Sequence, residues 1–341
     1  MNKEVLDISK IKIESKINEI LDKEIDIYKD NEFIKSSLEE LKRLSSEGKR
    51  VRGFLVKLGQ LLFGIDDDSF IEVAAALEIF QTAILIHDDI IDKSDKRRGM
   101  ETINAKYEGH LGISKGICIG DLGFFISYKI ISELNIENNV KTEIMKVYAR
   151  TLYNTVNGEI IDVELPLENM FYHKEMNEKI IYDIYVNKTA WYTIIGPILI
   201  GASFVNINEI DKQAIIDIGT NLGIAFQIKD DLLGLYSDVK IMGKTLNDIK
   251  EGKQTIIYKY AIDNCSIEDL ELISKFYGKE DITLEENNAI LDLFEKVGAR
   301  KNAEELVTIY TNKAIEIINK SSLLNKEVFI SFANYLLKRT N

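Results

Sequence analysis

An apolar stretch of the sequence ends in three closely spaced aspartates, Asp88, Asp89 and Asp92. The apolar residues before them recur at intervals of three and four, which predicts a helix. On a helix, Asp88 and Asp92 lie one turn apart on one face, where two carboxylates repel each other. A divalent cation would relieve that repulsion, and oxygen ligands favour a hard ion such as Mg²⁺. The stretch therefore predicts a metal site.

A solvated helix end is the alternative interpretation of these aspartates. Acidic residues stabilise the N-terminal end of a helix, but these aspartates follow about five turns of predicted helix. They therefore lie near the C-terminal end, where negative charge is unfavourable, and this argues against the alternative. A second acidic segment supports the metal site. There, Gln227 lies three residues before Asp230 and four before Asp231, so the amide and the carboxylates share a face of another apolar helix. Two such segments in one chain favour metal binding over a solvated surface.

Cationic residues occur both before and after the first acidic segment in the sequence. They are Lys49, Arg50 and Arg52, between Gly48 and Gly53, and the pair Arg97 and Arg98. Cations at the start of a helix oppose its dipole, and a bound anion would relieve that conflict. An arginine pair within ten residues of the aspartates can form a fork for a phosphate. Surface charge explains each group alone, but together they predict a polyanionic ligand.

Cations also occur around the second acidic segment. Lys188 and Thr189 stand at the edge of an uncharged run, and an isolated lysine of this kind is a candidate phosphate contact or ordinary surface. Lys244 and Lys253 belong to a polar, glycine-punctuated stretch, residues 243–255. That composition predicts a loop that closes over a ligand.

The elements that must position these residues are helices. The chain has 341 residues, 45% of them hydrophobic, and only 2 prolines. Proline interrupts helices, so its scarcity favours long ones, and strand signals are nearly absent. We expect an all-α helical bundle in a single domain, residues 1–341, in which residues 1–30 form an amphipathic helix on the core. Small residues at Gly120 and Gly158 predict close helix contacts.

The overall composition excludes several classes of function. A net charge of -13 argues against nucleic-acid binding, which needs a basic surface. The 2 cysteines are far apart in sequence and the N-terminus has no apolar leader, so we expect a cytoplasmic protein. The uncharged run Thr189–Asn208 is long enough to cross a membrane, but it contains Gly196, Pro197 and Gly201. We expect a buried central helix there and no transmembrane segment.

Taken in order, these motifs resemble those of the trans-isoprenyl diphosphate synthases, the polyprenyl synthetase family, across most of the chain. The family's glycine-lysine-arginine motif, first aspartate-rich motif and arginine pair all have counterparts. Those counterparts are Gly48, Lys49, Arg50 and Arg52, then Asp88, Asp89 and Asp92, then Arg97 and Arg98. Downstream, the family's remaining diphosphate and metal ligands correspond to Lys188, Thr189, Gln227, Asp230, Asp231, Lys244 and Lys253.

The resemblance implies two acidic helices that face each other across a cavity, three Mg²⁺ ions, for which Mn²⁺ can substitute, and a homodimer. The metal ligands would be Asp88, Asp89, Asp92, Asp230 and Asp231, and the catalytic residues Asp88, Asp92, Lys188, Asp230 and Lys244. All the cations of these motifs, Lys188 and Lys244 included, would bind the diphosphates together with Thr189 and Gln227. Metals and cations would stabilise a departing allylic diphosphate, and the double bond of isopentenyl diphosphate would attack the carbocation. Apolar walls would exclude water.

Two positions depart from the family's pattern. Gly53 stands where the family often has proline, and Gly234 replaces the third aspartate of the second acidic motif. Asp238 lies seven residues beyond Asp231, about 10 Å along a helix, which is too far to substitute directly. Some geranylgeranyl-type members share this Asp-Asp-Leu-Leu-Gly form, so the resemblance implies that activity is kept.

The length of the product depends on side chains along the first acidic helix. If the growing chain extends away from the metals, it meets Ile84 and Ala83 first, and Phe80 is the next large side chain on that face. Core packing is the alternative role of Phe80. Bulky aromatics at the first two positions stop the chain at fifteen carbons in the resembled family. The small Ala83 therefore predicts mainly geranylgeranyl diphosphate, with farnesyl or longer polyprenyl products as alternatives.

Three rival functions remain. A terpene cyclase has less need of a second diphosphate site, which Lys49, Arg52 and Arg98 would provide. A non-catalytic helical subunit that regulates an active partner would typically lose an aspartate-rich motif, and only position 234 is lost here. A di-iron bundle is disfavoured because paired Glu-x-x-His motifs are missing.

Overall fold

The computed structural model describes residues 3–167, 177–236, 248–279 and 281–338. Its regular structure is almost entirely helical, in agreement with the predicted all-α class. The chain divides into two compact units. Unit 1 comprises Met1–Tyr148, Pro197–Asn208 and Leu323–Val328, and unit 2 comprises Ala149–Gly196, Glu209–Ser322 and Phe329–Asn341.

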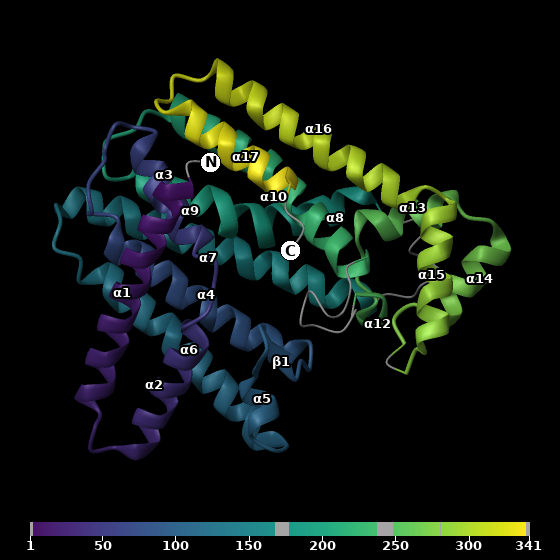
Figure 1. The fold of residues 1–341 in the computed structure, drawn as a ribbon, viewed down its shortest axis with the longest axis horizontal. Helices are drawn as coiled ribbons and strands as arrows, with labels where there is room; N and C mark the ends of the chain where they lie inside the picture. The colour runs from purple at the N-terminus through teal and green to yellow at the C-terminus, as the bar shows by residue number, and fades with distance from the viewer. Residues whose placement is uncertain (1–2, 168–176, 237–247, 280, 339–341) are drawn as a thin grey trace. The chain divides into compact units, whose positions relative to one another are not determined.

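Unit 1 contains the N-terminal helices, a short hairpin and one later helix (Figure 1). Its elements are α1 (Lys3–Ile27), α2 (Glu32–Ser45), α3 (Val51–Leu61), α4 (Ile71–Ile91), β1 (Lys96–Arg97), β2 (Met100–Glu101), α5 (Ile103–Lys106), α6 (His110–Ser132), the first part of α7 (Asn138–Glu164) and α9 (Gly196–Ala202).

Unit 2 contains the rest of α7 and most of the later helices. These are a 3₁₀ turn (Leu165–Leu167), α8 (Glu178–Ile184), the π-helix η3 (Tyr185–Ile195), α10 (Glu209–Tyr236), α12 (Asp248–Glu251), α13 (Ile256–Asn264), α14 (Ile267–Phe276), α15 (Leu284–Lys296), α16 (Ala299–Lys320) and most of α17 (Lys326–Lys338).

The core of unit 1 forms around α4, which packs against α1, α3 and α6. Glycines let α6 approach closely: a Cβ atom at Gly120 would lie 2.3 Å from His87 Nε2, and one at Gly123 would lie 2.9 Å from Ala83 Cβ. The close contact predicted at Gly120 is therefore confirmed. The helix predicted within residues 1–30 is also present, and its apolar side chains are buried at Ile13, Ile17 and Leu21.

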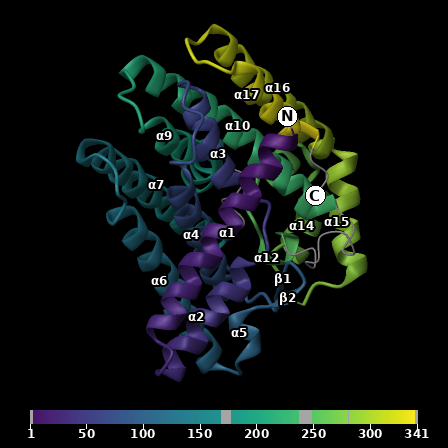
Figure 2. The ribbon, with the colours of Figure 1, turned by 60° about the vertical axis from the view of Figure 1, so that its left-hand side comes forward.

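A hairpin that the sequence analysis did not predict follows α4 (Figure 2). Strands β1 and β2 are antiparallel, with Arg97 paired to Met100. The two turn residues, Arg98 and Gly99, have φ angles of 53° and 78°. Positive φ at both central residues is the geometry of a type I′ turn, whose twist matches that of the adjoining strands. The hairpin thereby fixes the backbone that carries the arginine pair.

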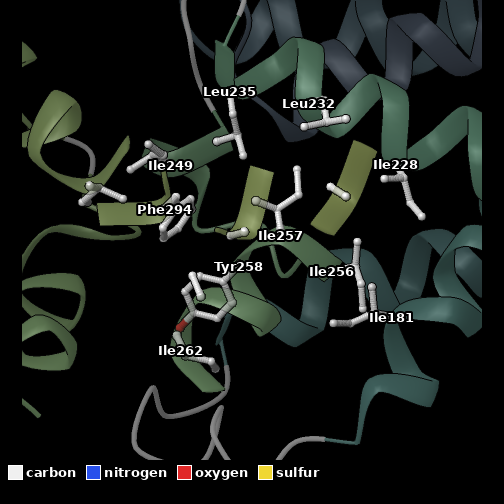
Figure 3. Packing of buried hydrophobic residues seen from close by; sticks show 14 of the residues in the cluster. Ile181, Ile228, Leu232, Leu235, Ile249, Ile256, Ile257, Tyr258, Ile262 and Phe294 are labelled. Atoms are coloured by element: carbon white, nitrogen blue, oxygen red, sulfur yellow. The ribbon is translucent and has the colours of Figure 1, made fainter. Parts of the chain in front are cut away.

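Unit 2 is organised around α10, which packs against η3 and α16. Gly223 of α10 allows close approach, since a Cβ atom there would lie 2.2 Å from Ala190 Cβ in η3. Next to this contact, Ile228 and Leu232 of α10 join buried residues from α13 and α15, among them Ile257 and Phe294 (Figure 3). This apolar cluster holds the second acidic helix in place.

The uncharged run Thr189–Asn208 is largely buried, as predicted, but it is not one helix. It begins inside η3, continues as α9 from Gly196 and leaves the helix after Ala202. Among the described residues, one helix is long and apolar enough to cross a membrane by length and composition, and it is α6, with 39% of its most apolar window buried. Close helix packing explains the small residues of the run, because Gly201 lies against the backbone of Val56.

Candidate active site

The first aspartates lie at the C-terminal end of α4. The N–H of Asp92 donates to the carbonyl of Asp88 at 2.8 Å, so the helical turn continues through both residues. Their side chains are partly exposed and share a face, as predicted. Asp89 is buried and accepts from Arg97 Nε at 2.6 Å. Asp88 and Asp92 are thus partly exposed, while Asp89 is buried and holds Arg97.

Arginines from two separate segments of unit 1 converge near Gly48. A Cβ atom there would lie 3.0 Å from Arg50 Nη1 and 3.2 Å from Arg98 Nη1. Loss of hydration lowers the pKa of Arg98, and so do the positive charges of Arg97, Arg50 and Arg52, against the opposing effect of Glu78. These arginines belong to two separate motifs of the sequence, and the structure brings them together. Positive charges held this close create a site that favours a polyanion.

Arg97 carries a donor that no group in the described structure uses. Its Nε binds Asp89, but its buried Nη2 has no hydrogen-bond partner. Arg97 lines a small pocket together with Asp89 and Arg98, and the other walls are mostly apolar, including Leu85 and Met100. A buried donor without an acceptor costs about 1–3 kcal/mol, more when it is charged. An anion in this pocket would satisfy that donor.

Arg50 is committed to acceptors of the protein itself. It stands before α3 with a φ of 53°, and its Nη2 donates to the carbonyl of Ser45 at 2.6 Å. Its Nε donates to Glu14 Oε1 at 3.3 Å. The side chain is buried, whereas that of Lys49 is exposed and that of Arg52 is intermediate. This geometry makes Arg50 a residue that fixes the loop before α3.

In unit 2, η3 positions Lys188 and Thr189. Lys188 Nζ lies 2.5 Å from Asp162 Oδ2 and 2.7 Å from Glu159 Oε2, both on α7. Gly158 makes this approach possible, because a Cβ atom there would lie 2.3 Å from the backbone nitrogen of Lys188. The ammonium group is therefore held between two carboxylates.

A buried chain of hydrogen bonds connects Thr189 to the second acidic motif. Thr189 Oγ1 donates to Gln227 Oε1 at 2.5 Å, and Gln227 Nε2 donates to Asp231 Oδ1 at 2.8 Å. The hydroxyl of Tyr185 donates to the other carboxylate oxygen of Asp231 and accepts from the N–H of Ile256 at 3.0 Å. Both oxygens of Asp231 are thus bound within the protein.

Burial is the largest influence on Asp231. It raises the pKa of this carboxyl to about 7. The hydrogen bonds from Tyr185 and Gln227 lower the pKa, and the negative charges of Asp248 and Asp230 raise it. Burial, with the charge of Asp231 and the hydrogen bond to it, also raises the pKa of Tyr185 well above its ordinary value. Asp230, one residue earlier, is less buried.

The predicted loop at residues 243–255 is described only from Asp248 onward, so Lys244 lies outside the described residues. Lys253 Nζ lies 2.9 Å from Glu251 Oε2 and 3.7 Å from Asp248 Oδ1. Among the predicted metal ligands, Asp88 and Asp92 in unit 1 and Asp230 in unit 2 are partly exposed, whereas Asp89 and Asp231 are buried. Metal binding by these five carboxylates stays a prediction.

These oxygen donors fit Mg²⁺ chemically. Throughout the described ranges, no three His, Cys, Asp or Glu side chains form a group that could hold an ion. Mg²⁺ usually binds through one or two carboxylates together with substrate phosphates and water. The pair Asp88 and Asp92 suits that mode, with the arginine cluster of unit 1 available to the phosphates.

The predicted product-length residues lie along α4. Ala83 is fully buried against Gly123 of α6, and Ile84 is partly exposed. The ring of Phe80 packs 5.0 Å from that of Phe124 and 5.8 Å from that of Tyr148. These residues form the contact between α4 and its neighbours, and their effect on product length stays a prediction.

Sequence reasoning missed the residues that hold others in place. Glu159 and Asp162 are spaced to share a helical face, which is a usable signal for the ion pair with Lys188. The hydrogen bond from Tyr185 to Asp231 had no signal, because the two residues are 46 positions apart.

Comparison with known proteins identifies the family. The family model for polyprenyl synthetases matches residues 34–294. A geranylgeranyl diphosphate synthase from Sulfolobus acidocaldarius is 30% identical over 313 residues, which cover 89% of this chain and 91% of that protein. A short chain isoprenyl diphosphate synthase from Methanocaldococcus jannaschii is 28% identical over 285 residues, 83% of this chain and 81% of that protein.

A solved structure agrees with these relatives. The crystal structure of a geranylgeranyl pyrophosphate synthase from Corynebacterium glutamicum, complexed with isoprenyl diphosphate and magnesium, matches with a TM-score of 0.88 at 25% identity, covering 98% of this chain and 99% of that one. The resemblance first found in the motifs is confirmed by sequence and by fold: this chain belongs to the polyprenyl synthetase family.

Proposed function

We propose that this chain condenses isopentenyl diphosphate with an allylic prenyl diphosphate and releases mainly geranylgeranyl diphosphate. The observation that carries the proposal is the convergence of Arg97, Arg98 and the arginines of the 48–53 segment within unit 1, which also contains Asp88 and Asp92. A site with partly exposed carboxylates and excess cations suits a ligand that brings both phosphate and metal.

The residues of the chain suggest how the reaction proceeds. Arg97 Nη2 would donate a charge-assisted hydrogen bond to the allylic diphosphate, and the guanidinium of Arg98 would bind the diphosphate of isopentenyl diphosphate. The bond from Arg97 would strengthen as negative charge develops on the departing diphosphate. The apolar walls beside them, such as Leu85, would keep water from an allylic cation. Mg²⁺, held by Asp88 and Asp92, would supply Lewis-acid stabilisation of the same leaving group.

Several details belong to the same proposal. We expect three Mg²⁺ ions in each site, with Mn²⁺ as a working substitute, and the relative from Corynebacterium glutamicum was crystallised with magnesium. The relative from Sulfolobus acidocaldarius is named a geranylgeranyl diphosphate synthase. The small, buried Ala83 supports a product longer than farnesyl.

Product analysis tests the proposal directly. The purified chain is incubated with isopentenyl diphosphate, Mg²⁺ and each allylic starter, and the dephosphorylated alcohols are separated by chromatography. We expect geranylgeraniol as the main product and none after chelation of the metal. Activity that appears only after a second protein is added would instead favour the regulatory-subunit alternative.

We further propose a homodimer formed through α6. Four apolar side chains of this helix are exposed within an arc of about 120°, namely Ile113, Ile117, Phe125 and Tyr128. Asp121 lies within the same arc. A charged group at this position is costly in lipid but can be paired in a protein interface, which favours a second copy over a membrane.

Light scattering on Phe125→Lys and Ile117→Lys tests this interface. Each variant should shift the protein from dimer to monomer, because a buried charge replaces apolar contact. Phe33→Lys, at an exposed apolar residue outside α6, is the matched control and should leave the mass unchanged. Variants that keep the mass of the wild type would place the interface elsewhere.

A further inference from the structure

Gly234 lies in the last turn of the long helix α10, where most other residues favour helix more than glycine does. It is also the position at which the second acidic motif lacks its third carboxylate. Position 234 is one turn beyond Asp230, so a side chain there would share a face with that aspartate. Both peculiarities have one explanation in the structure.

The carboxylate of Asp248 occupies the space that a side chain at position 234 would fill. A Cβ atom built on Gly234 would lie 2.1 Å from Asp248 Oδ2, 2.9 Å from its Cγ and 3.3 Å from its Oδ1. Those three atoms are the nearest neighbours of that Cβ position, and all belong to one carboxylate. Glycine is therefore the residue that admits Asp248 to this face of α10.

The backbone after Asp248 is anchored on the core of unit 2. Ile249 is buried, and its carbonyl accepts from the N–H groups of Gly252 at 3.2 Å and Gly278 at 2.8 Å. The N–H of Lys253 donates to the carbonyl of Asp248 at 3.0 Å. Asp248 is thus held in place from its C-terminal side.

The carboxylate of Asp248 lies close to the other acidic groups of the motif. Its side chain is 17% exposed, and its charge acts on Asp231 together with that of Asp230. Its Oδ1 is 3.7 Å from Lys253 Nζ, a cation predicted to bind diphosphate. Both oxygens of Asp231 are engaged by Tyr185 and Gln227. The carboxylate of Asp248, in the space beside Gly234, therefore adds near Asp230 a negative charge that the motif would otherwise lack.

We propose that Asp248 supplies, from a different helix, the carboxylate that Gly234 removes from the second acidic motif. It acts there as a positioning residue for Mg²⁺ with diphosphate. The inference rests on the proposed function, since it assigns a further residue to that same site. The proposal also accounts for the glycine. A side chain at position 234 would occupy the space that the Asp248 carboxylate fills, so only one of the two positions can provide a carboxylate there.

Exchange of the carboxylate between the two positions tests this directly. The variants are Asp248→Ala, the isosteric Asp248→Asn and the double variant Gly234→Asp with Asp248→Ala. Binding of inorganic pyrophosphate to the full chain is measured by calorimetry over a series of Mg²⁺ concentrations. The exposed Asp292 of α15, as Asp292→Ala, is the matched control. Circular dichroism establishes that each variant is folded.

We expect Asp248→Ala and Asp248→Asn to raise the Mg²⁺ concentration for half-maximal pyrophosphate binding by about tenfold or more, as for other groups that support a metal site. The double variant should recover most of that loss, and the control should match the wild type. A role in packing alone predicts the opposite, because asparagine has the shape of aspartate and would bind as the wild type does. That result, or no recovery in a folded double variant, overturns the inference.

The condensation assay separates this inference from the proposed function. If the wild type forms no prenyl product, the proposed function fails, whatever Asp248 does. If the wild type forms product and the Asp248 variants keep its Mg²⁺ dependence, only the role of Asp248 fails. If Asp248→Ala does not fold, Asp248→Asn, which preserves the shape against Gly234, decides the outcome.

Discussion

Replacement of Asp231 by asparagine should stabilise the metal-free protein at pH 8 and have a much smaller effect near pH 5. Burial raises the pKa of this carboxyl from 3.8 to about 7 in the folded protein. The folded state therefore binds the proton more tightly than the unfolded state does. Stability falls as the pH rises from about 4 to about 7, and then stays level.

The magnitude follows from the difference between the two pKa values. At 1.36 kcal/mol for each pKa unit, the ionised Asp231 costs on the order of 4 kcal/mol above pH 7, of which about 2.5 kcal/mol develops between pH 5 and pH 8. Asparagine avoids this cost because it stays neutral. Its oxygen can accept from Tyr185, and Gln227 and the hydroxyl of Thr189 can reverse their donor and acceptor roles.

Urea denaturation without metal, at half-unit steps from pH 5 to pH 8, measures this effect. The difference in unfolding free energy between Asp231→Asn and the wild type isolates the one group from the rest of the chain. Asp292→Asn, at an exposed site, provides the baseline. A difference that does not change with pH, or a variant less stable than the wild type at pH 8, would refute the reasoning about burial.

Further predictions concern catalysis and packing. Asp88→Ala should abolish condensation, measured as product formed, while leaving the thermal unfolding of the metal-free protein unchanged, because the side chain is partly exposed. Arg98→Ala should raise the Michaelis constant for isopentenyl diphosphate more than for the allylic substrate, which keeps its metal contacts, and an equal effect on both would contradict this. Phe80→Ala should lengthen the product, as chromatography of the alcohols would show, and cost about 3–5 kcal/mol of stability, whereas Ala83→Phe should shorten it to farnesyl. Gly59→Ala should lower stability by about 1–3 kcal/mol, measured by urea unfolding, because its Cβ atom would lie 2.2 Å from the carbonyl oxygen of Ile198.

Much of the fold could be predicted because it depends on local pattern. Apolar periodicity and scarce proline predicted the helix of Ile71–Ile91, and the structure has Asp88 and Asp92 on one face of it. The charge at Arg97 and Arg98 was also visible in sequence. Their hairpin was not, because it depends on the positive φ of Arg98, which an arginine adopts only when its surroundings require it.

The rest of the site depends on contacts between distant segments. The pairing of Asp248 with Gly234 joins residues across a polar stretch, and no spacing rule relates them. The burial of Asp89 against Arg97 likewise could not be read from three similar aspartates, since only packing distinguishes the buried one from its neighbours.

The π-helix η3 has a consequence for how this chain tolerates change. A π-helical segment holds one more residue than the α-helix that would replace it, so it behaves as an insertion that forms no loop. Loss of one residue between Tyr185 and Ile195 would let the segment close to an α-helix without rotating the helices on either side of it. Lys188 now faces α7 while Thr189, the next residue, faces α10. A deletion in this stretch, unlike one in a regular α-helix, would therefore alter the contacts made inside the segment and leave the elements on either side in register.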